Sequence, residues 1–106
     1  MSIPAVSIVD QVSAALSRAS LQHEVIASNI ANRDTEGYQR LQLRFDAAME
    51  RASVVAEPAG TDDQAPVSLE QDLVALSSNS ARYGALARVL SRYFSIAGAI
   101  TNYNRG

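Results

Sequence analysis

Two long stretches without proline carry apolar residues at helical spacing, and they restrict the fold more than any other feature. Proline occurs only at positions 4, 58 and 66. Between Val9 and Ile30, and again between Leu69 and Ile100, apolar or small residues recur every three or four positions. This spacing places them on one face of a helix. The pattern predicts one helix over about 7–32 and a second over about 68–102.

Local sequences at the ends of these segments support the two helices. Ser7 with Asp10, and Ser68 with Gln71, have the spacing of N-terminal capping boxes. Asn32 can adopt the left-handed conformation that ends a helix. We expect the two helices to pair along an apolar stripe. The expected stripe consists of Val9, Val12, Leu16, Ile26, Leu69, Leu73, Leu76, Tyr83, Leu90, Phe94 and Ile100.

The segment between the helices is less regular. Gly37 predicts a turn at 33–38, because glycine adopts positive φ without strain. Residues 39–52 are ambiguous: positions 41–45 alternate like a strand, whereas 45–52 read as a short helix. Two prolines and a glycine predict a loop over 53–67. The predicted fold is therefore all-α. It is a single domain, 1–106, in which long N- and C-terminal helices pair as a coiled-coil-like hairpin around a short irregular middle segment and loop.

The composition raises the question of what covers the outer faces of such a hairpin. Ala and Ser together make up 31 of the 106 residues, and only 19% of residues are charged. Small side chains bury little apolar area, and an isolated helix pair normally presents a densely charged side to water. Either the helices pack further against copies or relatives of the chain, or the chain is an ordinary alanine-rich monomer. Composition alone leaves both interpretations open.

The sequence lacks the residue groups of common catalytic and binding sites. It has no cysteine, and its one histidine, His23, lies on the apolar stripe, where a packed side chain is more common than a ligand or base. It has no glycine-rich phosphate loop. A net charge of −2 argues against binding of nucleic acid through a basic patch. We expect no enzyme activity, cofactor, metal ion, nucleic acid or small-molecule substrate.

Targeting signals are also missing from the sequence. No basic residue precedes Arg18, and no apolar run approaches the ~20 residues of a membrane span. We therefore expect neither a cleaved secretory signal nor a membrane-spanning helix.

One motif stands out where the first helix is expected to end. It consists of Ser28, Asn29, Ile30, Ala31, Asn32, Thr35, Gly37 and Tyr38. Asparagine suits helix ends because its amide bonds free backbone groups. The pattern SNIANxxTxGY resembles the signature of the bacterial flagellar axial proteins, which form the rod, the hook and the hook-associated structures. Glu36 replaces the proline that is usual in this turn. Residues 41–45, 67–73 and 94–100, with Asn79 and Tyr83, resemble the proximal rod members of that group.

The resemblance implies a structural function without catalysis. It implies a subunit of the flagellar basal-body rod, exported without a cleaved signal by the flagellar type III apparatus. Such subunits assemble helically into the tube that spans the periplasm, contains the export channel and transmits torque. The implied partners are further copies, other rod proteins and the rod-base protein that joins the rod to the membrane ring and export gate. The alternative, from periodicity and acidic pI, is a cytoplasmic helical-hairpin adaptor or export chaperone.

Overall fold

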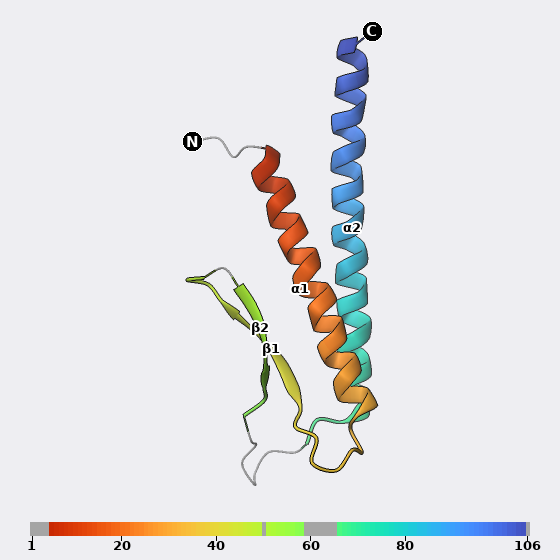
Figure 1. Ribbon diagram of the computed structural model, residues 1–106. Coiled ribbons are helices and arrows are strands. Elements are labelled where there is room, and N and C mark those ends of the chain that lie inside the picture. Colours follow the sequence, from red (N-terminus) through yellow and green to blue (C-terminus); the bar gives the residue numbers. More distant parts are fainter. Residues whose placement is uncertain (1–4, 50, 59–65, 106) are drawn as a thin grey trace.

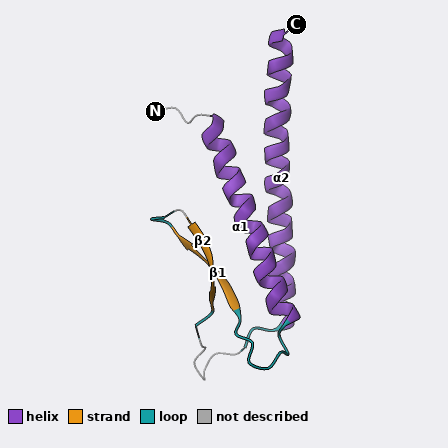
Figure 2. Cartoon of the chain, in the orientation of Figure 1, coloured by secondary structure: helices purple, strands orange, loops and turns teal. Residues whose placement is uncertain are grey.

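The computed structural model describes residues 5–49, 51–58 and 66–105, which form two long helices and a two-stranded antiparallel sheet. Helix α1 spans Ala5–Ala31, strand β1 Leu41–Asp46, strand β2 Arg51–Ala56 and helix α2 Leu69–Arg105. The two helices lie side by side near the end of α1 and diverge toward its beginning, where α2 continues well past α1 (Figure 1). The strand pair lies along α1 on the side away from α2 (Figure 2).

The prediction of a long helical hairpin is confirmed, with small differences at the ends. Helix α1 begins at Ala5, so position 7 lies inside the helix and not at its start, where the sequence placed it. At α2 the capping box is present: the Gln71 backbone N–H donates to Ser68 Oγ at 3.1 Å, and the Ser68 N–H donates to Gln71 Oε1 at 2.8 Å. Reciprocal bonds of this kind satisfy two backbone donors at the helix start.

The prediction of an all-α fold is wrong in the middle of the chain. Strand β2 covers positions for which we predicted other structure. Its first two residues fall in the predicted short helix at 45–52, and the rest fall in the predicted loop at 53–67. Asp46 Oδ1 accepts hydrogen bonds from the backbone N–H groups of Ala48 at 3.0 Å and Met49 at 3.3 Å. An acidic side chain bonded in this way resembles a helix cap. Here it bonds the turn at 47–49 that follows β1.

The core is small and lies where the two helices are closest. Ala19, Val25 and Ile26 are the apolar residues exposed by 5% or less among the described side chains. One buried polar contact crosses the helix pair, because Asn79 Nδ2 donates to the Ala19 carbonyl oxygen at 2.7 Å. This bond satisfies an amide that would otherwise destabilise the interface.

The molecule is much more extended than a globular chain of its length. Its radius of gyration is 18.7 Å, whereas a compact domain of this size has about 13 Å. Its accessible surface is 8168 Å², against about 5,700 Å² for a folded monomer of the same mass. Several of the exposed large apolar residues lie on α2, among them Val74, Val89 and Ile96. No helix in the described part of the chain is long and apolar enough to cross a membrane.

Candidate assembly site

Asn29 joins the end of α1 to the start of β1. Its side chain is buried, with 2% of the residue exposed. The amide Nδ2 donates to the Leu41 carbonyl oxygen at 2.9 Å, and Oδ1 accepts from the Leu41 N–H at 2.9 Å. Tyr38 also donates its hydroxyl to Asn29 Oδ1 at 3.0 Å. One amide thus satisfies both backbone groups of a strand residue, as a neighbouring strand would.

The remaining polar residues of the motif build the turn between α1 and β1. Asn32 Nδ2 donates to the Ser28 carbonyl oxygen at 3.0 Å, and Thr35 Oγ1 donates to Asn32 Oδ1 at 3.3 Å. The hydroxyls of Ser28 and Tyr38 are hydrogen-bonded at 2.9 Å. Gly37 has a φ of 78°, in the left-handed region that favours glycine. The motif therefore acts as a structural junction.

The two apolar members of the motif differ in burial. Ile30 is half-buried, and Ala31, the last residue of α1, is exposed. Neither residue contributes to the hydrogen bonds of the junction through its side chain. Any contact they make with another subunit remains a prediction.

A second link connects β1 to the start of α2. Arg40 donates two parallel hydrogen bonds to Asp72, Nη1 to Oδ2 and Nη2 to Oδ1, each at 2.9 Å. Arg40 Nε also donates to Glu57 Oε2 at 3.2 Å. Asp72 is 4% exposed, and the hydrogen bonds from Arg40 lower the pKa of its carboxyl below the ordinary value. A bidentate pair of this kind fixes the relative orientation of the two side chains and also adds stability.

A third link holds the strand pair against α1. The guanidinium carbon of Arg18 lies 4.8 Å from the centroid of the Phe45 ring, a favourable cation–π geometry. Sequence reasoning did not identify Arg40, Asp72 or Arg18 as parts of the junction. Asp72 was visible only as an acidic residue in the first turn of the second helix.

The predicted stripe is only partly brought together. Ile26 is buried, and Val9, Val12, Leu16, Leu69, Leu76 and Leu90 are half-buried. The exposed members are Leu73 at 48%, Tyr83 at 45%, Phe94 at 54% and Ile100 at 57%. The expectation that His23 is packed is wrong, because this residue is exposed. Exposure of the stripe is therefore not confined to the far end of α2, since Tyr83 is exposed although it lies beside Leu16 of α1.

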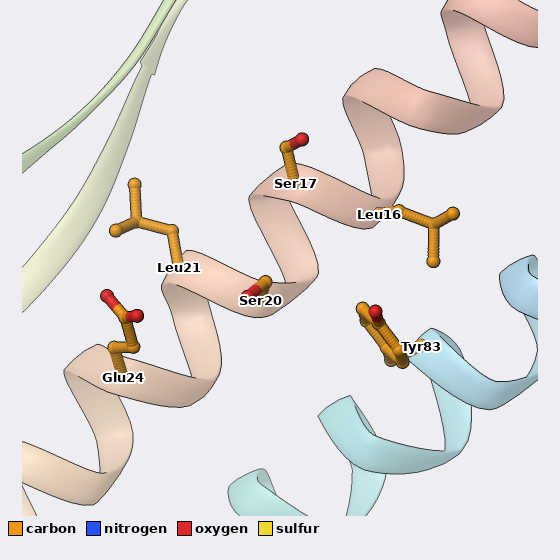
Figure 3. Close-up of a pocket in the computed structure, with 6 residues that line it drawn as sticks. All are labelled: Leu16, Ser17, Ser20, Leu21, Glu24 and Tyr83. Carbon is orange, nitrogen blue, oxygen red and sulfur yellow. The ribbon is translucent and has the colours of Figure 1, made fainter.

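The hollows between the elements are lined by apolar and polar residues together. Figure 3 shows one of them, where Leu16 of α1 and Tyr83 of α2 point toward one another while Leu21 and Glu24 point away from α2. A small-molecule site places several polar groups around one point. Among the described residues, no three His, Asp or Glu side chains are grouped so as to hold a metal ion.

Comparison with known proteins finds a similarity for one segment of the chain. No curated protein and no solved structure matches the chain. Residues 12–39 match the model of a family described as Flagella basal body rod protein. The match runs from the first half of α1 through the turn and includes all eight motif residues. The segment that builds the junction is therefore similar to the flagellar basal-body rod family.

Proposed function

We propose that the chain is a structural, non-enzymatic subunit of the bacterial flagellar basal-body rod. The observation that carries the proposal is the match of residues 12–39 to the rod family model. The matched residues form a hydrogen-bonded junction, in which Asn29 and Tyr38 hold the first strand against the end of α1. A subunit that carries load requires such a fixed angle between its elements.

The unburied surface supports a role in assembly. With 8168 Å² of accessible surface, the chain exposes about 2,400 Å² more than a globular monomer of its mass. An interface of standard size buries about 1,600 Å² in total. Exposed apolar residues lie along α2, among them Val74 at 66% and Ile96 at 56%. Neighbouring subunits would remove this surface from water.

The finer assignment is to a proximal rod subunit of the FlgB type, and it rests on the sequence resemblance. In this role the chain is exported by the flagellar type III apparatus without a cleaved signal. It then assembles helically with further copies and other rod proteins, and it meets the rod-base protein at the membrane ring and export gate. The assembled tube spans the periplasm, encloses the export channel and transmits torque.

Localisation tests the proposal directly. Basal bodies are purified from the source bacterium carrying an epitope-tagged chain, and the rod fraction is probed by immunoblot and mass spectrometry. We expect the chain in the rod, in a fixed ratio to the other rod proteins. Recovery only from the cytoplasm, in a defined complex with one client, would establish the adaptor or chaperone alternative instead.

A pair of substitutions at Asn32 tests the role of the junction in that assembly. The Asn32 backbone N–H donates to the Ser28 carbonyl oxygen at 3.0 Å. Asn32→Pro removes this donor, whereas Asn32→Gly keeps it and suits a helix end. We expect Asn32→Pro to abolish rod completion and swimming at normal expression, and Asn32→Gly to retain most motility. Equal swimming in both variants would remove this segment from the proposed role.

A further inference from the structure

The outer edge of β2 carries backbone groups that the strand pair does not use. The Glu57 N–H donates to the Arg40 carbonyl oxygen at 2.8 Å, and the register pairs Leu41 with Ala56 and Leu43 with Val54. Hydrogen-bonded and non-hydrogen-bonded pairs alternate in an antiparallel ladder. The N–H and C=O groups of Ala52, Val54 and Ala56 therefore point away from β1. Within the described residues, these groups form no hydrogen bond outside the strand pair.

This edge also lacks the usual protection against pairing. Natural edge strands are blocked by lysine, proline, a bulge or an element that covers them. Positions 52–56 read Ala-Ser-Val-Val-Ala, without charge or proline, and the pairing with β1 is regular. The opposite edge is blocked, because Asn29 binds both backbone groups of Leu41 and α1 packs against β1. Within the described residues, the outward backbone groups of β2 have no partner of this kind, and at its start Arg51 and Ala52 line a hollow together with residues of α1.

We propose that the free chain forms a weak symmetric dimer by antiparallel pairing of β2 with β2 of a second copy. In the proposed register Val54 lies opposite Val54 of the second copy, and Ala52 lies opposite Ala56. Each of these pairs brings outward N–H and C=O groups face to face. The result is a four-stranded sheet in the order β1–β2–β2–β1.

Charge complementarity selects this register. It places Arg51 opposite Glu57 of the second copy, twice by symmetry, with both side chains on the same face of the sheet. Opposite charges facing each other across strands stabilise the pairing. Glu57 uses Oε2 for its bond to Arg40, so Oε1 can receive a second cation. A shift of two residues in either direction removes the Arg51–Glu57 opposition.

The geometry also limits the assembly to two copies. Because α1 lies on the β1 side, β2 of one copy cannot reach β1 of the next, and the pairing closes on itself. The area buried between two strand edges is small, so the dimer belongs to the weak class of interfaces. It is an association of the free chain, separate from the helical contacts of the proposed rod.

The absence of cysteine from the sequence allows a direct test by disulfide formation. The Cα atoms of a hydrogen-bonded antiparallel pair lie about 5.5 Å apart, within the range that a disulfide spans. Purified Val54→Cys is oxidised mildly at high protein concentration, beside Ser53→Cys as the matched control. In the proposed register Ser53 lies opposite Val55 of the second copy. The Cα atoms of the two Ser53 residues are therefore farther apart than those of the two Val54 residues. We expect disulfide-linked dimer to form at least about tenfold faster for Val54→Cys.

Two further measurements show whether the disulfide forms because the strands are paired or because the molecules collide at random. In strong denaturant the rates of the two variants should become equal, because only thiol encounter then matters. Adding Arg51→Glu to Val54→Cys sets like charges opposite each other, and we expect dimer formation several-fold slower at low salt. Circular dichroism of each variant verifies that the helices are retained. Equal rates for Val54→Cys and Ser53→Cys under native conditions, or a rate indifferent to Arg51→Glu, would overturn the proposal.

Discussion

At the scale of single residues, Asn29 is the buried side chain that joins α1 to β1. Asn29→Ala removes three hydrogen bonds and leaves the N–H and C=O groups of Leu41 without a partner. Unsatisfied backbone groups of this kind destabilise a protein by about 1–3 kcal/mol each. We expect the free energy of unfolding to fall by about 2–4 kcal/mol, measured by urea unfolding followed by circular dichroism.

The matched control for this substitution is Asn102→Ala, at an exposed position of α2. It removes an amide of the same type that makes no side-chain hydrogen bond among the described residues, so we expect no loss in the free energy of unfolding. Hydrogen exchange gives a local readout, because the Leu41 amide should lose protection only in Asn29→Ala. If both variants were equally stable, Asn29 would not hold the junction.

The bond between Arg40 and Asp72 should make stability depend on pH in the acid range. The hydrogen bonds from Arg40 lower the pKa of the Asp72 carboxyl in the folded chain. In the unfolded chain an aspartate carboxyl has a pKa of about 3.9. The folded state therefore binds the proton less readily. The contribution of this pair is complete above about pH 4 and is lost as the pH falls through the lowered folded value.

Asp72→Asn measures this contribution. At pH 7 we expect the variant to be less stable than the natural chain by about 1–2 kcal/mol. The difference should shrink as the pH falls from about 4 through the lowered folded pKa, since Asp72 is then progressively protonated and becomes neutral like asparagine. Urea unfolding at a series of pH values provides the comparison. A difference that stayed constant down to pH 2 would mean that Asp72 is not stabilised as an anion.

How far the sequence predicts the junction depends on the distance along the chain between the partners. Asn32, Gly37 and Tyr38 were identifiable because helix ends and turns are built from neighbours. Arg40 and Asp72 are 32 positions apart, and they meet only after the strand pair and both helices are in place. No local pattern in the sequence encodes such a pair.

At the scale of elements, the helices were predictable and the strand pair was not. Apolar spacing sustained over many turns identifies a helix strongly. The strand pair has only six residues in each strand, and its connection lacks the Asn-Gly or Asp-Gly signal of a tight hairpin. Residues 45–52 favour a helix locally, and pairing with β1 overrides that preference. Short segments of this kind depend on their partners more than on their own propensity.

Replacing two glycines by alanine tests whether the turn needs glycine while the helix favours alanine. Gly37 has positive φ, so Gly37→Ala adds strain even though the space around it is open. Gly98 lies in α2 with nothing within 4 Å of an added Cβ. We expect Gly37→Ala to destabilise by about 1 kcal/mol and Gly98→Ala to stabilise by about 0.5–1 kcal/mol. Thermal or urea unfolding measures both, and a change of the same sign in both variants would contradict the backbone assignment of the turn.

At the scale of the whole molecule, the shape is set by the unequal lengths of the helices. Helix α1 has 27 residues and α2 has 37, so α2 continues without a partner (Figure 1). We call residues 94–105 the α2 extension. It exposes Phe94 at 54%, Ile100 at 57% and Tyr103 at 86%. Helical stability in proteins comes mostly from packing of an apolar face, and Figure 1 shows no other described element beside this end of α2.

The extension should therefore open easily in the free chain and become protected on assembly. We expect hydrogen exchange followed by mass spectrometry to show slow exchange near Asn79, where α2 packs on Ala19, and fast exchange over the α2 extension. A helix without tertiary contacts opens with a free energy close to zero. In isolated basal bodies the same peptides should exchange at least about a hundredfold more slowly, since neighbouring subunits bury them. Uniform protection along α2 in the dilute chain would show that the extension is stable alone, and unchanged exchange in basal bodies would show that no subunit covers it.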